Sequence, residues 1–387
     1  SYEAECCFKY FYDNFSRQEQ SYGLMRDKYP KNDKCCSISA TGFMLASMVA
    51  GEQLGYIGKE EARNICEKTL STLLTLPESH GFFYHFYDKD NCQRLYKCEL
   101  STIDTALLIA GAITAGQHFG LQDKADKVFD RIDWNYFVDK DKQMFYMARY
   151  DNGFCGYWDV YAEQLILYIL ACGAKEENRI DKNIYYSFQR LVGTYDKYEY
   201  IYSWFGSIFT YQFSHAFVSF KGLVDEDGTD WFNNSVIASL SARQYCIDNA
   251  SNHAGYGANS WGLTSCVTPN DYQGRIGCIP SGNGNIENIS DGTVAPCGAI
   301  GSIIFTPKES ISAMEHYSHI DRLNGEYGFF DSYNADFNWV CDEYISIDKG
   351  ISLIMIANWY NGCVQNAFGS NQNIINSLKY LGFKEEK

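Results

Sequence analysis

Carboxyl groups in apolar surroundings mark two places in the sequence where proton transfer could occur. Glu163 lies in GYWDVYAEQLILYIL, where nearly every residue after the acid is apolar. Asp348 lies in IDKGISLIMIANWY, just ahead of a glycine and a long apolar run. Burial raises the pKa of a carboxyl group, which suits Glu163 to the role of general acid. The structural alternatives are a helix-end acid held by backbone groups for Glu163 and an N-cap for Asp348.

A pair of such acids is typical of enzymes that hydrolyse glycosidic bonds. One carboxylic acid protonates the leaving oxygen, and a second carboxylate across the sugar ring acts as base or nucleophile. Glu99 and Asp104, in CELSTIDTALLIAG, flank the start of another apolar segment and would point into the same site. Asp104 could instead close a capping box. Asp291 opens DGTVAP, where an aspartate is equally typical of a tight turn.

Aromatic residues are more numerous than a core requires, at 16% of the chain. Sugar rings can stack on aromatic faces, so we expect some of these side chains to line a groove, with core packing as the alternative for each. His215, in FTYQFSHAFVSF, sits among aromatic residues, where a histidine is more often a core residue than a catalyst. Beside the acids, the residues expected to contact substrate are His85, Trp158, Tyr161, His215, Trp261, Glu326 and Trp339.

Neither a metal nor a cofactor is expected. His80 and His85 flank GFFY without an acid at ligand spacing, and the vicinal cysteines lack the C-x-x-C spacing of zinc or redox sites. The Gly-rich GNGN lacks the lysine of a phosphate loop. An odd total of 15 cysteines favours a reducing compartment and a role as small core fillers.

The charge of the chain restricts its partners. A formal net charge of −16 disfavours nucleic acids and anionic membranes, whose binding requires clustered Lys and Arg. The sequence contains no run of about 18 apolar residues and does not start like a signal peptide, so we expect no membrane span. A neutral polysaccharide or oligosaccharide is compatible with this surface, and we expect a monomer.

Helical periodicity recurs in pairs along the chain, in which an apolar segment is followed by one with a charged face. This pattern predicts an all-α fold, a single (α/α)6 barrel over residues 1–387, with an irregular helical bundle as the alternative. The Gly/Asn-rich stretch 251–294 would cover one mouth, and 80–99 reads as a β-hairpin at that rim. The predicted helices are 37–55, 59–76, 101–119, 122–132, 157–173, 182–195, 209–220, 231–250, 295–305, 306–317, 351–360 and 368–381.

Several segments together resemble the bacterial glycoamylase-like family that includes the endo-β-1,2-glucanases. The resemblance runs through ELSTIDTALLIAGAITAGQHF, WDVYAEQLILYIL, QFSHAFVSFKG, NSWGLTSC, DGTVAPCGAIGSIIFTPKESI, GEYGFFDSYN and IDKGISLIMIANW. It implies an (α/α)6 barrel and an inverting hydrolase, with Glu163 as proton donor and Asp348 as base. In the glucanases the proton can pass through a substrate hydroxyl. Glu99 and Asp104 match the family's E-x-S-T-I-D segment and look like subsite or supporting residues.

The chain departs from the family where Lys349 follows the proposed base, in a segment that often reads I-D-Q-G-P. A neighbouring lysine would favour the charged carboxylate of Asp348. We expect a β-glucan hydrolase, most consistent with an endo-β-1,2-glucanase. The alternatives are a transglycosylase or cyclising enzyme of the same fold and a non-catalytic sugar-binding toroid. Family members are often exported, which contrasts with the reducing cytoplasm that the cysteines favour.

Overall fold

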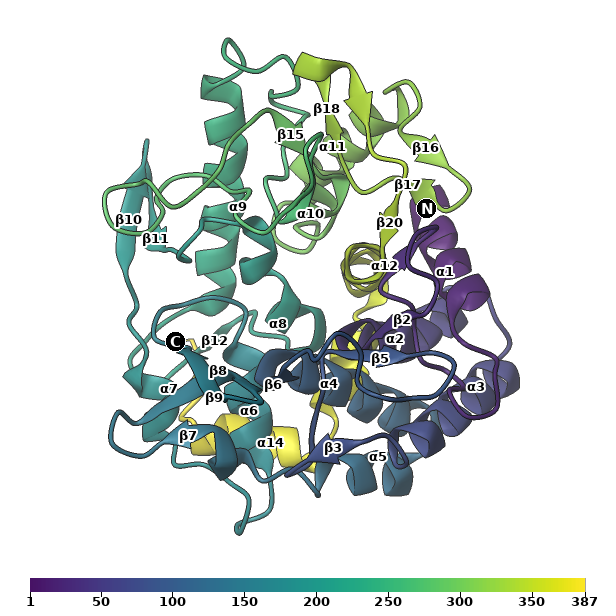
Figure 1. Ribbon diagram of the computed structural model, residues 1–387. Coiled ribbons are helices and arrows are strands. Elements are labelled where there is room, and N and C mark those ends of the chain that lie inside the picture. Colours follow the sequence, from purple (N-terminus) through teal and green to yellow (C-terminus); the bar gives the residue numbers. More distant parts are fainter. Residues whose placement is uncertain (387) are drawn as a thin grey trace.

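The computed structural model describes residues 1–386 and shows a helix-rich chain with many short strands (Figure 1). The prediction of a helix-rich chain is confirmed, but the fold is not purely α-helical. The helices are α1 (Tyr2–Asn14), α2 (Ile38–Gln53), α3 (Lys59–Leu73), α4 (Thr102–Phe119), α5 (Gln122–Phe129), α6 (Leu165–Gly173), α7 (Asn183–Ser187), α8 (Phe213–Phe217), α9 (Trp231–Asp248), α10 (Pro296–Ile300), α11 (Pro307–Ser318), α12 (Ser346–Asn361), α13 (Cys363–Gly369) and α14 (Gln372–Tyr380).

The strands are two to seven residues long and mostly pair with one neighbour. They are β1 (Lys28–Tyr29), β2 (Cys35–Ser37), β3 (Glu78–Ser79), β4 (Phe82–Phe83), β5 (Phe86–Asp88), β6 (Leu100–Ser101), β7 (Val138–Asp139), β8 (Met144–Tyr150), β9 (Gly153–Tyr157), β10 (Val192–Tyr195), β11 (Tyr198–Ile201), β12 (Leu223–Val224), β13 (Cys266–Val267), β14 (Tyr272–Gln273), β15 (Thr293–Val294), β16 (Asn324–Gly325), β17 (Gly328–Phe329), β18 (Tyr333–Asn334), β19 (Trp339–Val340), β20 (Tyr344–Ile345) and β21 (Lys384–Glu385).

The apolar helices lie inside and the amphipathic ones lie outside. Helices α2, α4, α6 and α12 are buried along most of their length, whereas α3 and α5 bury one face. The burial of these four helices follows from their sequence, because a helix that is apolar on every side has no face that favours water. The contact between α2 and α4 is backbone on backbone: a Cβ at Gly111 would lie 2.0 Å from the carbonyl oxygen of Gly42.

Short strands tie the starts of the inner helices into one rim. Strands β2, β6 and β20 run directly into α2, α4 and α12. The carbonyl of His85 accepts the Ile38 N–H at 3.1 Å, and the His85 N–H reaches the carbonyl of Glu99 at 3.0 Å, which joins the starts of α2 and α4. At α12, the Ser346 N–H donates to the carbonyl of Asp27 at 3.0 Å. The acids that precede or begin these helices are therefore brought to the same end of the molecule.

Several predicted elements differ in extent. The helix predicted from 157 starts only at Leu165, because residues up to 157 extend in β9, and the one predicted over 182–195 ends at Ser187 and continues into β10. Residues 209–220 split into a 3₁₀ turn and α8, and 295–305 holds only the short α10. In the predicted 80–99 hairpin, the segment folds back on itself through an antiparallel bridge between Tyr87 and Arg94, and β5 also pairs with β2.

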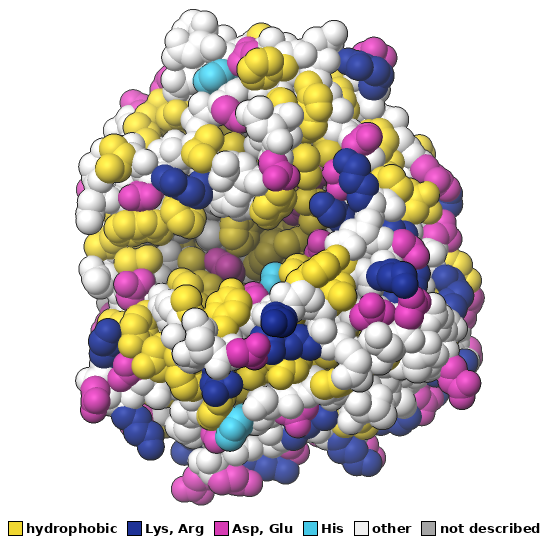
Figure 2. All heavy atoms as spheres, viewed as in Figure 1, with side chains coloured by type: hydrophobic (Ala, Val, Ile, Leu, Met, Phe, Trp, Pro, Cys, Tyr) yellow, Lys and Arg dark blue, Asp and Glu magenta, His cyan; other side chains and the backbone are white. Residues whose placement is uncertain are grey.

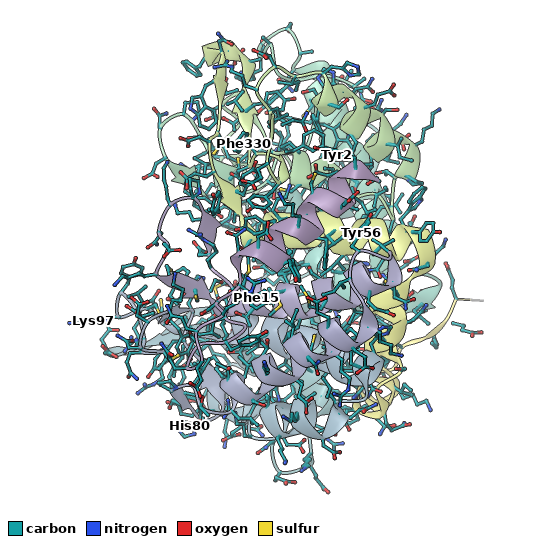
Figure 3. The ribbon with its side chains drawn as sticks, turned by 90° about the vertical axis from the view of Figure 1, so that its right-hand side faces the viewer. Tyr2, Phe15, Tyr56, His80, Lys97 and Phe330 are labelled. Carbon is teal, nitrogen blue, oxygen red and sulfur yellow. The ribbon has the colours of Figure 1, made fainter. Side chains whose placement is uncertain are left out.

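Helix α1 was not predicted, although it begins with a regular N-cap at Ser1. It packs against α12 along the outer side of the molecule, and Tyr2 and Phe15 mark its two ends in Figure 3. Among residues 1–386, no helix is both long and apolar enough to span a membrane. All 15 cysteines lie in this part of the chain without a disulfide, and most are buried, as core fillers would be.

Candidate active site

The front face of the molecule contains a hollow with apolar walls and acidic groups at its edge (Figure 2). Glu163 lies just before α6 and is only partly exposed. The neighbouring Gln164 side chain fixes this turn by accepting the Ala162 N–H at 2.6 Å and donating to the carbonyl of Val160 at 2.7 Å. From α8, the Ser214 hydroxyl donates to the carbonyl of Glu163 at 2.6 Å. The backbone that carries Glu163 is therefore held from both sides.

Burial raises the pKa of Glu163 from 4.5 to about 7, against a smaller lowering by its own backbone N–H and with a further rise from Asp104. A carboxyl group with this pKa is protonated at mildly acidic pH and can release its proton to a reacting oxygen near neutrality. The side chain keeps some exposure, so it faces an enclosed space that water can enter. These are the properties of a general acid.

His85, Glu99 and Asp104 form a compact cluster at the start of α4. His85 Nδ1 lies 2.9 Å from Glu99 Oε1, and His85 Nε2 lies 3.8 Å from Asp104 Oδ1. Burial alone would lower the pKa of His85, but Asp104, Glu99 and Asp27 raise it to about 9. The three side chains lie close enough to hold a metal ion, a possibility that the sequence did not indicate. In the protein as described, an imidazolium between two carboxylates already satisfies the cluster.

Asp348 lies in the first turn of α12 and is 7% exposed. It does not cap the helix, because the N-cap is Ile345, so the N-cap alternative does not hold. Its carboxyl group instead lines a small cavity together with Asp331 and Cys297. Burial and the adjacent Asp331 raise the pKa of Asp348 well above its ordinary value.

Each of the two predicted catalytic acids interacts with a neighbouring aspartate. The charge of Asp104 raises the pKa of Glu163, and the charge of Asp27 raises the pKa of Asp348. Asp104 also acts on Asp27, whose pKa is raised first by burial. Asp27 thus interacts electrostatically with Asp104 and with Asp348, and its carbonyl holds the start of α12.

Tyr272 extends over this cluster from the long stretch between α9 and α10. Its side chain is 49% exposed, yet enclosure by the walls raises its pKa, to which Asp348 and Asp331 add. A side chain that is both surrounded and open to water lies at the edge of a hollow. The expectation that residues 251–294 cover one mouth is consistent with this position.

Four of the residues expected to contact substrate belong to the core. Trp261 is fully buried, and Tyr161 is 1% exposed and stacks on Trp231 with ring centroids 4.7 Å apart. His215 is 1% exposed, lies 3.0 Å from the Ser235 hydroxyl, and has a pKa lowered to about 3 by burial. Trp158 is 5% exposed and donates to Thr102 Oγ1 at 3.0 Å. Aromatic content alone could not separate these packed rings from rings that line a groove.

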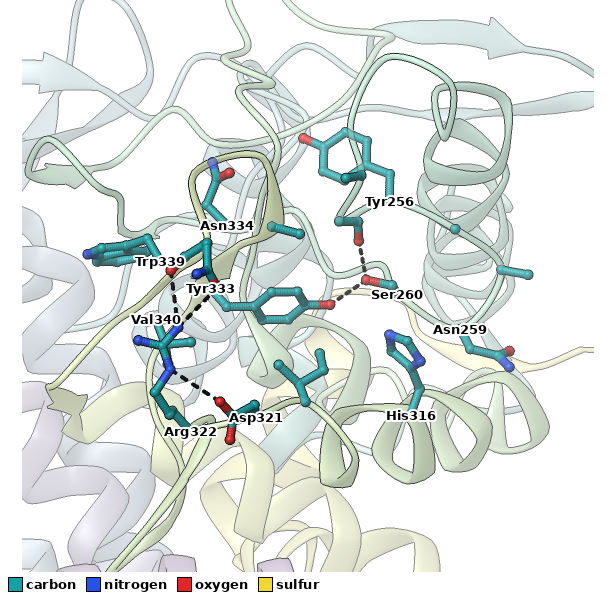
Figure 4. A pocket seen from close by; sticks show the side chains of 17 residues that line it. Tyr256, Asn259, Ser260, His316, Asp321, Arg322, Tyr333, Asn334, Trp339 and Val340 are labelled. Carbon is teal, nitrogen blue, oxygen red and sulfur yellow. Dashed lines mark hydrogen bonds and ion pairs between the residues drawn. The ribbon is translucent and has the colours of Figure 1, made fainter.

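Two other residues expected to contact substrate have partners within the protein, and a third lines a separate pocket. Glu326, expected to contact substrate, lies in the turn between β16 and β17 and forms an ion pair with Lys9 of α1 at 3.2 Å. Asp291 Oδ1 accepts the Thr293 N–H at 3.0 Å, the geometry of its turn-forming alternative. Trp339 lines a different pocket, between the loop after α9 and strands β18 and β19, that none of the clustered acids lines (Figure 4).

A family model described as glycoamylase, putative glucoamylase, matches residues 156–372. This match covers more than half of the chain and includes both Glu163 and Asp348. The chain belongs to this family.

The proteins similar to this chain match nearly all of it, but the chain covers different shares of their own lengths. A curated relative from Parabacteroides distasonis, named exo beta-1,2-glucooligosaccharide sophorohydrolase (non-reducing end), is 26% identical over 97% of this chain. The chain spans 57% of that relative's length. An endo-beta-1,2-glucanase from Chitinophaga pinensis, solved with sophorotriose and glucose, has a TM-score of 0.88 at 24% identity and covers 99% of this chain and 97% of its own. A putative glucoamylase from Bacteroides fragilis has a TM-score of 0.87 at 25% identity, and the match covers 99% of this chain and 96% of that protein.

Lys349, where this chain departs from the family pattern, does not act on the proposed base as predicted. Its Nζ lies 2.7 Å from Glu3 Oε1 and 3.1 Å from the carbonyl oxygen of Phe329, and both charged side chains are buried. The lysine is thus neutralised by α1, and the charges that act most strongly on Asp348 are those of Asp331 and Asp27. The prediction failed because it took a sequence neighbour for a spatial one, and α1 was not anticipated.

Two functional candidates were missed by sequence reasoning. Asp331 lies in GFFDSYN, a segment that contributed to the family resemblance, so its acid could have been singled out there. Asp27 lies in LMRDKYP, which contains no apolar periodicity or motif that marks a buried acid. Only the folding of this loop against α12 brings Asp27 into the cluster.

Proposed function

We propose that this chain is a glycoside hydrolase that cleaves β-1,2-linked glucan, most consistent with endo action and inversion. The observation that carries the proposal is the partly exposed carboxyl group of Glu163 just before α6, whose pKa burial and the nearby Asp104 raise to about 7. The named activities of the Parabacteroides and Chitinophaga proteins support the choice of substrate. We also propose that the helices close into an (α/α)6 barrel, that residues 1–387 form one catalytic domain, and that the domain acts as a monomer.

The residues of the site account for each proton in the reaction. Asp348 accepts a proton from a water molecule as the water oxygen bonds to the anomeric carbon. The glycosidic C–O bond breaks, and the proton of Glu163 goes to the leaving oxygen, directly or through a substrate hydroxyl. Glu99, Asp104 and His85 form one charged cluster, in which Asp104 acts on the pKa of Glu163, and they offer charged partners for sugar hydroxyl groups. These roles remain the assignments to be tested.

Activity assays with a panel of linear substrates test the proposal. The purified chain is incubated with β-1,2-glucan, other β-glucans, starch and maltooligosaccharides, and the products are separated by size. We expect cleavage of β-1,2-glucan into mixed oligosaccharides and none of starch. Release of disaccharide only, from one end, would refute endo action, and rapid glucose release from maltooligosaccharides would refute the linkage.

Variants of the two acids separate catalysis from binding. Glu163→Gln and Asp348→Asn are each expected to lower kcat by at least ~100-fold while the folded protein still binds glucan, because each removes one proton-transfer step. Glu326→Gln is the matched control, since this acid pairs with Lys9 instead. Longer products than the starting chains would indicate a transglycosylase, and binding without any turnover in the unaltered protein would indicate a sugar-binding toroid.

A further inference from the structure

Asp331 and Asp348 form a pair of carboxyl groups that the proposed mechanism uses only in part. Asp331 is 5% exposed and Asp348 is 7% exposed, and both line the same small cavity beneath the rim. Each carboxyl group raises or lowers the pKa of the other, as close neighbours do. Two carboxylates offer only acceptors, so a hydrogen bond between them requires one proton.

The remaining contacts of Asp331 show where that proton is needed. Its Oδ2 accepts the Val267 N–H at 2.7 Å, which fixes the carboxyl group in one orientation. Its Oδ1 is buried and finds no ordinary donor among residues 1–386. An acceptor buried without a donor is costly, and a proton shared with Asp348 removes that cost.

Among residues 1–386, no lysine, arginine or histidine forms an ion pair with Asp331 or Asp348. Lys349 points to Glu3, and Lys28 lies 3.3 Å from Glu343. The titratable or charged groups that act on the pair are Asp27, Lys28, Cys266, Tyr272, Cys297, Cys341 and Glu343. Except for Lys28, these groups are either neutral or negatively charged, so they favour retention of the proton.

We propose that Asp331 is a positioning residue that shares one proton with Asp348 and so sets the protonation state of the base. When Asp348 receives a proton from water, the shared proton resides on Asp331, which donates a hydrogen bond to the Asp348 carboxylate. The pair then carries one negative charge instead of two. This inference rests on the proposed function for the role of Asp348, but the shared proton itself does not. Burial raises the pKa of Asp331 to about 6 and that of Asp348 well above its ordinary value, so at neutral pH the pair keeps one proton, which passes to Asp331 when Asp348 acts as base.

Two variants of Asp331 test the shared proton through the pH profile of kcat/KM. In Asp331→Asn, the amide can accept from Val267 and donate to Asp348, so it mimics the protonated acid. We expect its acidic limb to stay within about 0.5 pH units of the unaltered protein. Asp331→Leu cannot donate, so the charged form of Asp348 loses its hydrogen bond and the acidic limb should rise by about 1 pH unit or more. Asp225→Asn, at another buried aspartate, is the control and should leave the limb in place.

Three other outcomes for the Asp331 variants would refute the proposal. A fall of the acidic limb by ~1 unit or more in Asp331→Asn would show that two separate anions had repelled each other. Unchanged limbs in both variants would show that Asp331 does not act on the base, and complete inactivity of a folded Asp331→Asn protein would show that Asp331 takes part directly.

A readout without substrate separates this inference from the proposed function. With ¹³C-labelled aspartate, the infrared band of one protonated carboxyl group should be present at pH 7, lost in Asp331→Asn, and kept in Asp225→Asn. If the chain does not hydrolyse β-1,2-glucan but this band behaves as expected, the function is wrong and the shared proton stands. If the band is absent from the unaltered protein, the shared proton is refuted whatever the activity.

Discussion

The raised pKa of Glu163 has a consequence for stability that can be measured without substrate. The unfolded chain releases this proton near pH 4.5, whereas the folded chain keeps it until about pH 7. Below pH 4.5 both states are protonated and the group makes no difference. Between these values the unfolded state gains by ionising first, so the free energy of unfolding falls as pH rises, and above pH 7 the full cost remains.

Glu163→Gln removes this cost because glutamine has a similar shape and does not ionise. A difference of 7 − 4.5 units corresponds to about 3 kcal/mol. We therefore expect the variant and the unaltered protein to have the same free energy of unfolding at pH 4, and the variant to be more stable by up to about 3 kcal/mol at pH 8. The same variant should have a lower kcat. Urea unfolding at several pH values measures the difference.

The exposed Glu326→Gln provides the control, with a small change that is the same at each pH. A stability gain for Glu163→Gln that does not vary with pH would refute the burial argument. So would a loss of stability at pH 8, because it would mean that the ionised carboxylate is well satisfied in the fold. Either result would also remove the physical reason for Glu163 as general acid.

Three further predictions concern the core. Gly111→Ala should destabilise the protein by several kcal/mol in urea unfolding, since its Cβ would lie 2.0 Å from the carbonyl oxygen of Gly42 and both helices would have to separate. Lys349→Met should cost about 3–5 kcal/mol by leaving Glu3 buried without its cation, with the pH profile of activity unchanged. Trp261→Phe should lower Tm and leave KM unchanged, whereas a raised KM would indicate that this ring contacts the substrate.

The inner helices were predictable because their physical signal is local. In segments such as STIDTALLIAGAITAG, the absence of a polar face and the small residues indicate burial on all sides, and α4 has that environment. The carboxyl groups ahead of such helices were also visible, because an acid is conspicuous beside an apolar run. Glu163 and Asp348 were singled out in this way, and they lie just before α6 and in the first turn of α12.

The rest depended on contacts between distant segments. The pairs Lys349–Glu3 and Asp348–Asp331 join residues far apart in sequence, and no periodicity encodes them. For aromatic rings the ambiguity is chemical: Trp261 in the core and Tyr272 at the edge of the hollow are both large apolar side chains beside polar residues. Only burial, which is a property of the folded chain, distinguishes a packed ring from one that can meet a sugar.

The position of the acids at helix starts opposes the burial that raises their pKa values, and magnitudes decide which effect prevails. The N-terminus of a helix stabilises a carboxylate by roughly 0.3–1 kcal/mol, which lowers its pKa by less than one unit. Glu163 before α6 nevertheless has a pKa of about 7, so desolvation outweighs the helix. For Asp348, in the first turn of α12, Asp331 adds like charge to desolvation. The helices thus fix where the acids lie, while the surrounding apolar walls and neighbouring carboxyl groups determine when they give up a proton.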